Sequence, residues 1–104
     1  MAYNGKPFFK IPRPILVDGG VESKTLSGNL TLTDKDSLFL FVDGGAAARD
    51  ITLPSLKSGR IYHIKNTGST YNLVVKDQVA STIATLTPGQ KAFIVCDGVG
   101  WYSA

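Results

Sequence analysis

The sequence has little of what catalysis or metal binding requires. Cys96 is the only cysteine, so no disulfide can form within the chain, and its apolar neighbours predict a buried thiol. His63 is the only histidine, and it has no accompanying set of His or Cys ligands and no Gly-x-Ser-x-Gly nucleophile turn. We therefore expect no enzyme active site, no bound metal and no cofactor, and a structural or surface role for His63.

Long apolar runs and dense charge are also missing. The amino terminus lacks the apolar stretch of a signal peptide, and nowhere do about eighteen apolar residues follow one another. The sequence therefore predicts a soluble protein that is made in a cytoplasm and has no membrane partner. Charged residues make up 18% of the chain and the net charge is +3, without a dense basic cluster. Nucleic acid is therefore not an expected partner.

Carboxylates occur mainly beside glycine. Asp18, Asp43 and Asp97 each precede a glycine, which fits turns in which the Asp side chain accepts a hydrogen bond from the backbone two residues on. Loop carboxylates can also bind calcium, but the spacing of an EF-hand is missing. Turn capping is the interpretation that we favour.

Residues 1–28 differ in character from the rest of the chain. Pro7, Pro12 and Pro14 bias the residues before them toward extended conformations and prevent a regular helix. The segment is nevertheless rich in large apolar side chains, each of which loses about 1.5–3 kcal/mol of stabilisation if it stays in water. We predict an extended N-terminal arm that reaches another protein surface. The arm residues expected to make this contact are Phe8, Phe9, Lys10, Ile11, Arg13 and Ile15.

Residues 29–104 have the spacing of an all-β domain. Short apolar segments alternate with Gly, Pro, Asn and Asp at intervals of roughly ten residues, and no segment has the length and pattern of a helix. No internal repeat is evident. The sequence therefore predicts a jelly-roll-like β-sandwich of about eight short strands. The predicted strands lie near residues 29–33, 38–43, 50–53, 60–66, 72–76, 82–86, 91–97 and 100–103.

Two of the predicted strands are apolar on both faces. Between Leu38 and Val42, Phe39 and Phe41 share one face while the other face is aliphatic, and Phe93 has the same relation to its neighbours. A sandwich buries one face of each strand, so Phe39, Phe41 and Phe93 are predicted to form an outer apolar patch. We expect this patch to be the interface of a homo-oligomer, or to be covered by the arm of a neighbouring copy.

Four other aromatic residues leave a second interpretation open. Tyr62, Tyr71, Trp101 and Tyr102 could form a platform on which a sugar ring stacks. Packing in the core or at an interface is the commoner position for aromatic residues of strands. A carbohydrate site therefore remains an alternative.

Several short segments, taken in order, resemble a β-sandwich module of tailed-bacteriophage structural proteins. That module occurs in capsid decoration (cement) proteins and in head or tail fibres, and the resemblance extends from about Leu30 to Tyr102. The segments that carry it are Leu32-Thr33, Val42-Asp43, Ile51-Thr52-Leu53-Pro54, Ile64-Lys65-Asn66-Thr67-Gly68-Ser69, Asn72-Leu73-Val74-Val75, Leu86-Thr87-Pro88-Gly89-Gln90 and Val95-Cys96-Asp97-Gly98-Val99-Gly100-Trp101-Tyr102.

The resemblance implies a non-enzymatic virion protein, commonly a trimer. Because the sequence shows no long repetitive shaft, a decoration protein is favoured over a fibre. Such a protein would lie on the capsid surface, would bind the major capsid protein through its arm, and would stabilise the assembled shell. The alternative is a tail-fibre or adhesin module in which exposed aromatic residues such as Tyr71 bind carbohydrate of the host surface.

Overall fold

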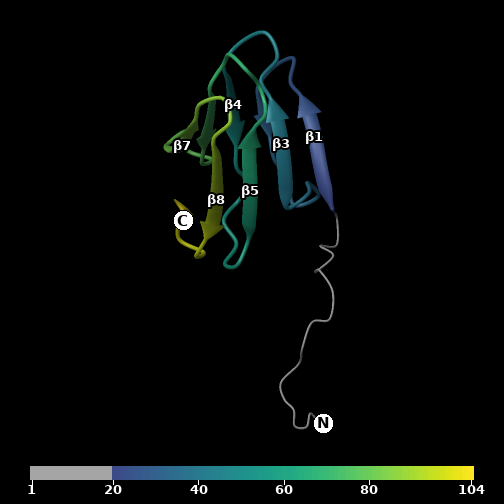
Figure 1. Ribbon diagram of the computed structural model, residues 1–104. Helices are drawn as coiled ribbons and strands as arrows, with labels where there is room; N and C mark the ends of the chain where they lie inside the picture. The colour runs from purple at the N-terminus through teal and green to yellow at the C-terminus, as the bar shows by residue number, and fades with distance from the viewer. Residues whose placement is uncertain (1–19) are drawn as a thin grey trace, which may run out of the picture.

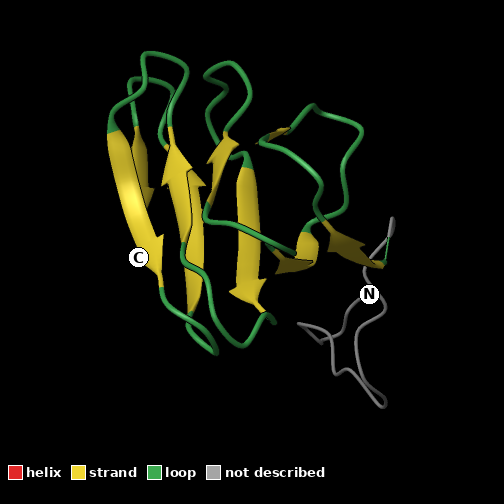
Figure 2. Cartoon of the chain, turned by 90° about the horizontal axis from the view of Figure 1, so that it is seen from above, coloured by secondary structure: helices red, strands yellow, loops and turns green. Residues whose placement is uncertain are grey.

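The computed structural model describes residues 20–104, which form nine strands in two sheets. No helix is present among these residues (Figure 2), which confirms the all-β prediction. The strands are β1 (Val21–Thr25), β2 (Leu30–Thr31), β3 (Phe39–Asp43), β4 (Arg49–Thr52), β5 (Ile61–Asn66), β6 (Leu73–Lys76), β7 (Thr82–Leu86), β8 (Lys91–Cys96) and β9 (Trp101–Ser103).

Strand β1 was not expected from the sequence. Each of the eight predicted strands has a counterpart in β2 to β9, whereas residues 21–25 were assigned to the arm. In the structure β1 pairs in parallel with β3, from Val21 opposite Phe39 to Thr25 opposite Asp43. The predicted contact residues Phe8, Phe9, Lys10, Ile11, Arg13 and Ile15 lie outside the described residues.

The first six strands wind around the core. The five-stranded sheet has the order β1-β3-β5-β8-β9 and the four-stranded sheet the order β2-β4-β6-β7, so successive strands from β1 to β6 alternate between the sheets. As a result β1, β3 and β5 run in parallel, as their arrows in Figure 1 show, and so do β2, β4 and β6. The last three strands add antiparallel pairs, with β7 against β6 and β8 between β5 and β9.

This winding differs from the expected jelly roll, which is built from antiparallel strands. Four of the seven strand pairs here are parallel. The physical reason is that a turn residue marks where a strand ends but does not decide which sheet the next strand joins. The coarser description, two sheets packed on one core, is the part of the prediction that the structure supports.

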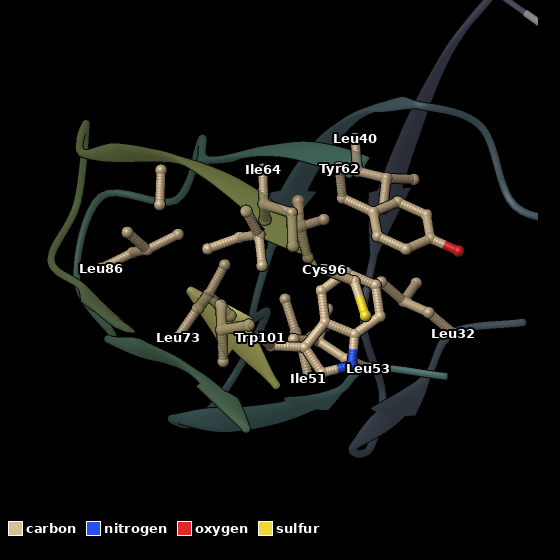
Figure 3. Close-up of a cluster of buried hydrophobic side chains, with 14 residues drawn as sticks. Leu32, Leu40, Ile51, Leu53, Tyr62, Ile64, Leu73, Leu86, Cys96 and Trp101 are labelled. Carbon is tan, nitrogen blue, oxygen red and sulfur yellow. The ribbon is translucent and has the colours of Figure 1, made fainter. Parts of the chain in front are cut away.

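The core lies between the two sheets (Figure 3). Alternation along the strands places Leu40 and Val42 of β3 inward, fully buried. Tyr62 and Trp101 are also buried, with ring centroids 6.0 Å apart, and their polar atoms donate hydrogen bonds to the carbonyls of Thr33 and Pro54. The remaining core residues are Leu32, Ile51, Leu53, Ile64, Leu73, Val75, Leu86, Ala92, Ile94 and Cys96.

Asn66, at the end of β5, is a fully buried polar residue. Its side-chain amide donates hydrogen bonds to the carbonyls of Tyr71 and Leu86, and its side-chain oxygen accepts one from the N–H of Gly68. Buried amides require such partners, since an unpaired polar group costs free energy. Asn66 therefore fastens the β5–β6 connection and the end of β7 to the five-stranded sheet.

Candidate interaction surface

The outer face of the five-stranded sheet carries the aromatic residues that the core does not use. Because Leu40 and Val42 point inward, Phe39 and Phe41 lie on the outer face, and Phe93 does so on β8. The register aligns Val21, Phe39, His63 and Phe93 in one row across four strands. We call this surface the aromatic face; its residues are Val21, Phe39, Phe41, Ile61, His63, Phe93, Val95 and Tyr102.

His63 lies between the two phenylalanines of this row. Its ring centroid is 5.4 Å from that of Phe39 and 6.4 Å from that of Phe93, with tilted ring planes in both pairs. These distances are typical of attractive aromatic contacts. The three rings therefore form one continuous strip on a face where Phe93 is 39% exposed and Val21 is 57% exposed.

Sequence reasoning did not place His63 on this surface. It predicted a structural or surface histidine, whereas the strand register is what places the ring between Phe39 and Phe93. The Nδ1 atom of His63 is buried and has no hydrogen-bond partner among residues 20–104. A buried polar atom without a partner is uncommon in a native protein.

Two lysines border the aromatic face. Lys65 of β5 lies directly opposite Lys91 of β8, and Phe41 lies opposite Lys65 on the other side. Neither lysine takes part in the ion pairs found within residues 20–104, which join Lys24 to acidic residues near β1 and Lys76 to Asp50. Like charges directly opposite each other on a ladder destabilise it, so this pair favours contact with an anionic group.

The outer face of the four-stranded sheet has a different character. Asp50 and Lys76 form an ion pair there, with 3.1 Å between the carboxylate oxygen and the ammonium nitrogen. Threonines occupy most of the other outward positions. The outward residues of β2, β4, β6 and β7 are Thr31, Asp50, Thr52, Val74, Lys76, Thr82 and Thr85. A mostly polar face of this kind needs no partner to cover it, in contrast to the aromatic face.

The edge at β1 is unsuited to adding a further strand. Glu22 and Lys24 occupy the positions of β1 that pair with the inward-facing Leu40 and Val42. Their side chains form an ion pair of 3.0 Å, and Lys24 also lies 3.9 Å from a carboxylate oxygen of Asp36. Inward-pointing charges at an edge strand are a known means of preventing edge-to-edge association. Contact through the aromatic face is therefore favoured over contact through this edge.

The four aromatic residues of the alternative carbohydrate site do not form one platform. Tyr62 and Trp101 are buried in the core, 3% and 4% exposed. Tyr71, in the β5–β6 connection, is 40% exposed, and Tyr102 of β9 is 54% exposed on the aromatic face. Only Tyr71 and Tyr102 can therefore present a ring to a ligand.

The structure also bears on the predicted buried cysteine and on the predicted turn-capping carboxylates. Cys96 is buried, and its sulfur accepts hydrogen bonds from the backbone N–H groups of Lys57 and Gly98. Asp43 accepts one from the N–H of Gly45, and Asp97 caps its turn in the same way. Asp18 lies outside the described residues. The predicted turn capping is thus confirmed for Asp43 and Asp97.

Within the part of the chain that the structure describes, no pocket opens and no three His, Cys, Asp or Glu side chains gather where they could bind a metal ion. The same residues include no helix with the length and apolar character needed to span a bilayer. Comparison of the chain with protein-family models, with curated proteins and with solved structures gives no match. The aromatic face with its two lysines is therefore the feature from which function must be argued.

Proposed function

We propose that this chain is a structural protein of a phage virion, a capsid decoration protein without enzymatic activity. In this proposal three copies associate through the aromatic face, and the part of the N-terminal arm that precedes β1 binds the major capsid protein. The two-sheet body, which consists of residues 29–104 together with β1, serves as a β-sandwich that holds both contacts in place. The protein would be made in the host cytoplasm and would then join the capsid surface.

One observation carries the proposal. The core is filled without Phe39, Phe41 and Phe93, which lie on the outer face of the five-stranded sheet. Phe93 is 39% exposed, and Phe39 and Phe41 are half-buried, so on association each still gains part of the about 1.5–3 kcal/mol that full burial of a large apolar side chain provides. Exposed apolar patches of this kind usually mark interaction sites.

The mechanism follows from mass action. A protein that binds the assembled shell, and binds the separate subunits less well, stabilises the shell by an amount that grows with its free concentration. An apolar arm that lies against a capsid subunit in extended form can add main-chain hydrogen bonds and fill pockets with its side chains. Phe8, Phe9 and Ile11 are the residues proposed to fill such pockets.

Capsids that lack this protein provide the test. Full-length protein should bind them saturably and raise the temperature at which they rupture. Protein without residues 2–16 should keep its folded body but lose capsid binding. The matched control is Tyr71→Ala in the full-length chain, which should bind capsids normally. Unchanged capsid binding after the deletion would refute the role of the arm.

A second candidate function rests on the exposure of Tyr71. In a tail-fibre or adhesin module, this half-exposed loop ring would stack on a sugar of the host surface. A glycan array separates the two proposals. Glycan binding that disappears in Tyr71→Ala, together with no affinity for capsids, would favour the adhesin; capsid binding with no glycan signal would favour the decoration protein.

A further inference from the structure

The aromatic face carries positive charge that the described residues, 20–104, leave uncompensated. Lys65 and Lys91 are cross-strand partners, and no carboxylate among residues 20–104 forms an ion pair with either. Asp43, on the same face, already accepts a hydrogen bond from the N–H of Gly45. A surface that covers this face therefore has to bring both an apolar contact for the rings and a negative group for the lysines.

This charge distribution disfavours packing two copies with their aromatic faces together. Such a contact would place four lysines in one interface, because each copy contributes Lys65 and Lys91. A two-fold dimer uses the same patch on both copies, whereas every contact in a ring joins two different patches. The lysine pair thus favours a ring in which the aromatic face meets another, acidic part of the neighbouring copy.

Asp34 is the described carboxylate best suited to that role. It is exposed, in the connection between β2 and β3, and it neither accepts a hydrogen bond nor forms an ion pair within residues 20–104. The other described carboxylates already have partners: Asp36 accepts from the N–H of Thr33, and Glu22 pairs with Lys24. An intermolecular contact of Asp34 would therefore break no bond within the subunit.

We propose that the aromatic face of one copy receives the β2–β3 connection of a second copy, with Asp34 of that copy between Lys65 and Lys91. This inference rests on the association proposed above and specifies its geometry. The Phe39–His63–Phe93 strip supplies the apolar part of the contact, and the ion pairs select the partner surface and its orientation. The assembly is then a closed ring with one kind of contact, repeated at each subunit.

Charge reversal tests the contact directly. Lys91→Glu places a glutamate opposite Lys65, a pairing that favours the subunit fold, so any loss concerns association. We expect this variant, and Asp34→Lys, to raise the dissociation constant about tenfold or more in sedimentation equilibrium at low salt. A chain that combines Lys65→Glu, Lys91→Glu and Asp34→Lys should regain most of the affinity.

Lys57→Glu is the matched control, since Lys57 is exposed and has no ion pair among the described residues. The dissociation constant of this variant's oligomer should equal that of the native chain.

The possible outcomes are distinct. Association of the native chain should weaken as salt rises from about 0.05 M to about 0.5 M, because exposed ion pairs are screened. An oligomer whose affinity is the same in Lys91→Glu and Asp34→Lys as in the native chain overturns the inference while leaving the proposed association intact. The inference is also overturned if the oligomer keeps its affinity in Asp34→Lys but dissociates when residues 2–16 are deleted. That result would mean that the arm covers the aromatic face. A native chain that stays monomeric at high concentration refutes the proposed association itself.

Discussion

Replacing Asn66 with alanine removes three hydrogen bonds from one fully buried side chain. The side-chain amide donates to the carbonyls of Tyr71 and Leu86, and the side-chain oxygen accepts from the N–H of Gly68. In each of these hydrogen bonds the donor and acceptor atoms are 2.9 Å apart. These bonds join β5 to the β5–β6 connection and to the end of β7. Alanine leaves all three backbone groups without this partner.

The magnitude follows from the environment of each group. The carbonyl of Leu86 is buried with the amide, and leaving it unpaired costs about 1–3 kcal/mol. The bonds to Tyr71 and Gly68 are only partly buried, so water can replace them and each loss costs about 0.5–1.5 kcal/mol. We expect Asn66→Ala to lower the free energy of unfolding by about 2–6 kcal/mol, a large share of the roughly 5–15 kcal/mol of a typical domain.

Urea unfolding followed by tryptophan fluorescence measures this change, because Trp101 is the only tryptophan and is buried in the core. Two asparagines serve as controls. The side chain of Asn29 accepts one exposed hydrogen bond, from the N–H of Asp50, so Asn29→Ala should cost about 0.5–1 kcal/mol. The exposed side chain of Asn72 has no such bond, and Asn72→Ala should change little. A cost for Asn66→Ala no larger than that for Asn29→Ala, at an unchanged denaturant slope, would refute the reasoning.

Three further predictions concern pH and backbone conformation. Burial raises the pKa of Tyr62 above its ordinary value of 10.0, so stability should fall in thermal melts as the pH rises above about 10, and Tyr62→Phe should remove this part of the loss. Hydrogen bonds from the N–H groups of Gly100 and Val99 lower the pKa of Asp97, so its contribution should be lost as the pH falls from about 3.8 downward; melts of Asp97→Ala should lack that component. Both Gly45 and Gly59 have positive φ, but a Cβ at residue 45 would overlap a backbone oxygen while one at residue 59 would meet nothing. In urea unfolding Gly59→Ala should therefore cost about 1–2 kcal/mol, and Gly45→Ala clearly more.

The strand positions could be predicted because local chemistry determines where strands end. Asp43-Gly44 and Asp97-Gly98 end β3 and β8, and the Asp side chains cap the turns as expected. The position of Phe39 and Phe41 outside the core was also predictable, since a strand that is apolar on both faces has only one face to bury.

The winding and its register could not be predicted in this way. Residues 21–25 have no apolar alternation, because Glu22 and Lys24 occupy the inward positions of β1, so nothing marked the segment as a strand. The regular return of the chain to the five-stranded sheet cannot be recognised in the sequence, because successive windings differ in length. The segment from Val21 to its partner Phe39 is shorter than the segment from Phe39 to its partner His63. The contacts of His63, and the pairing of Lys65 with Lys91, depend on that register and are therefore properties of the tertiary structure.

The two sheets differ in how well their outer surfaces suit a partner. An edge strand exposes unpaired backbone groups, and the β1 edge is guarded by the ion pair of Glu22 and Lys24. With this edge blocked and the outer face of the four-stranded sheet mostly polar, the aromatic face is the sheet surface within residues 20–104 that best suits an apolar partner. Its aromatic rings can bind many apolar surfaces, whereas Lys65 and Lys91 favour only a partner surface that carries negative charge. Specificity in this protein is therefore expected to depend on the lysines, and affinity on the rings, so mutations at the two groups should separate the two properties.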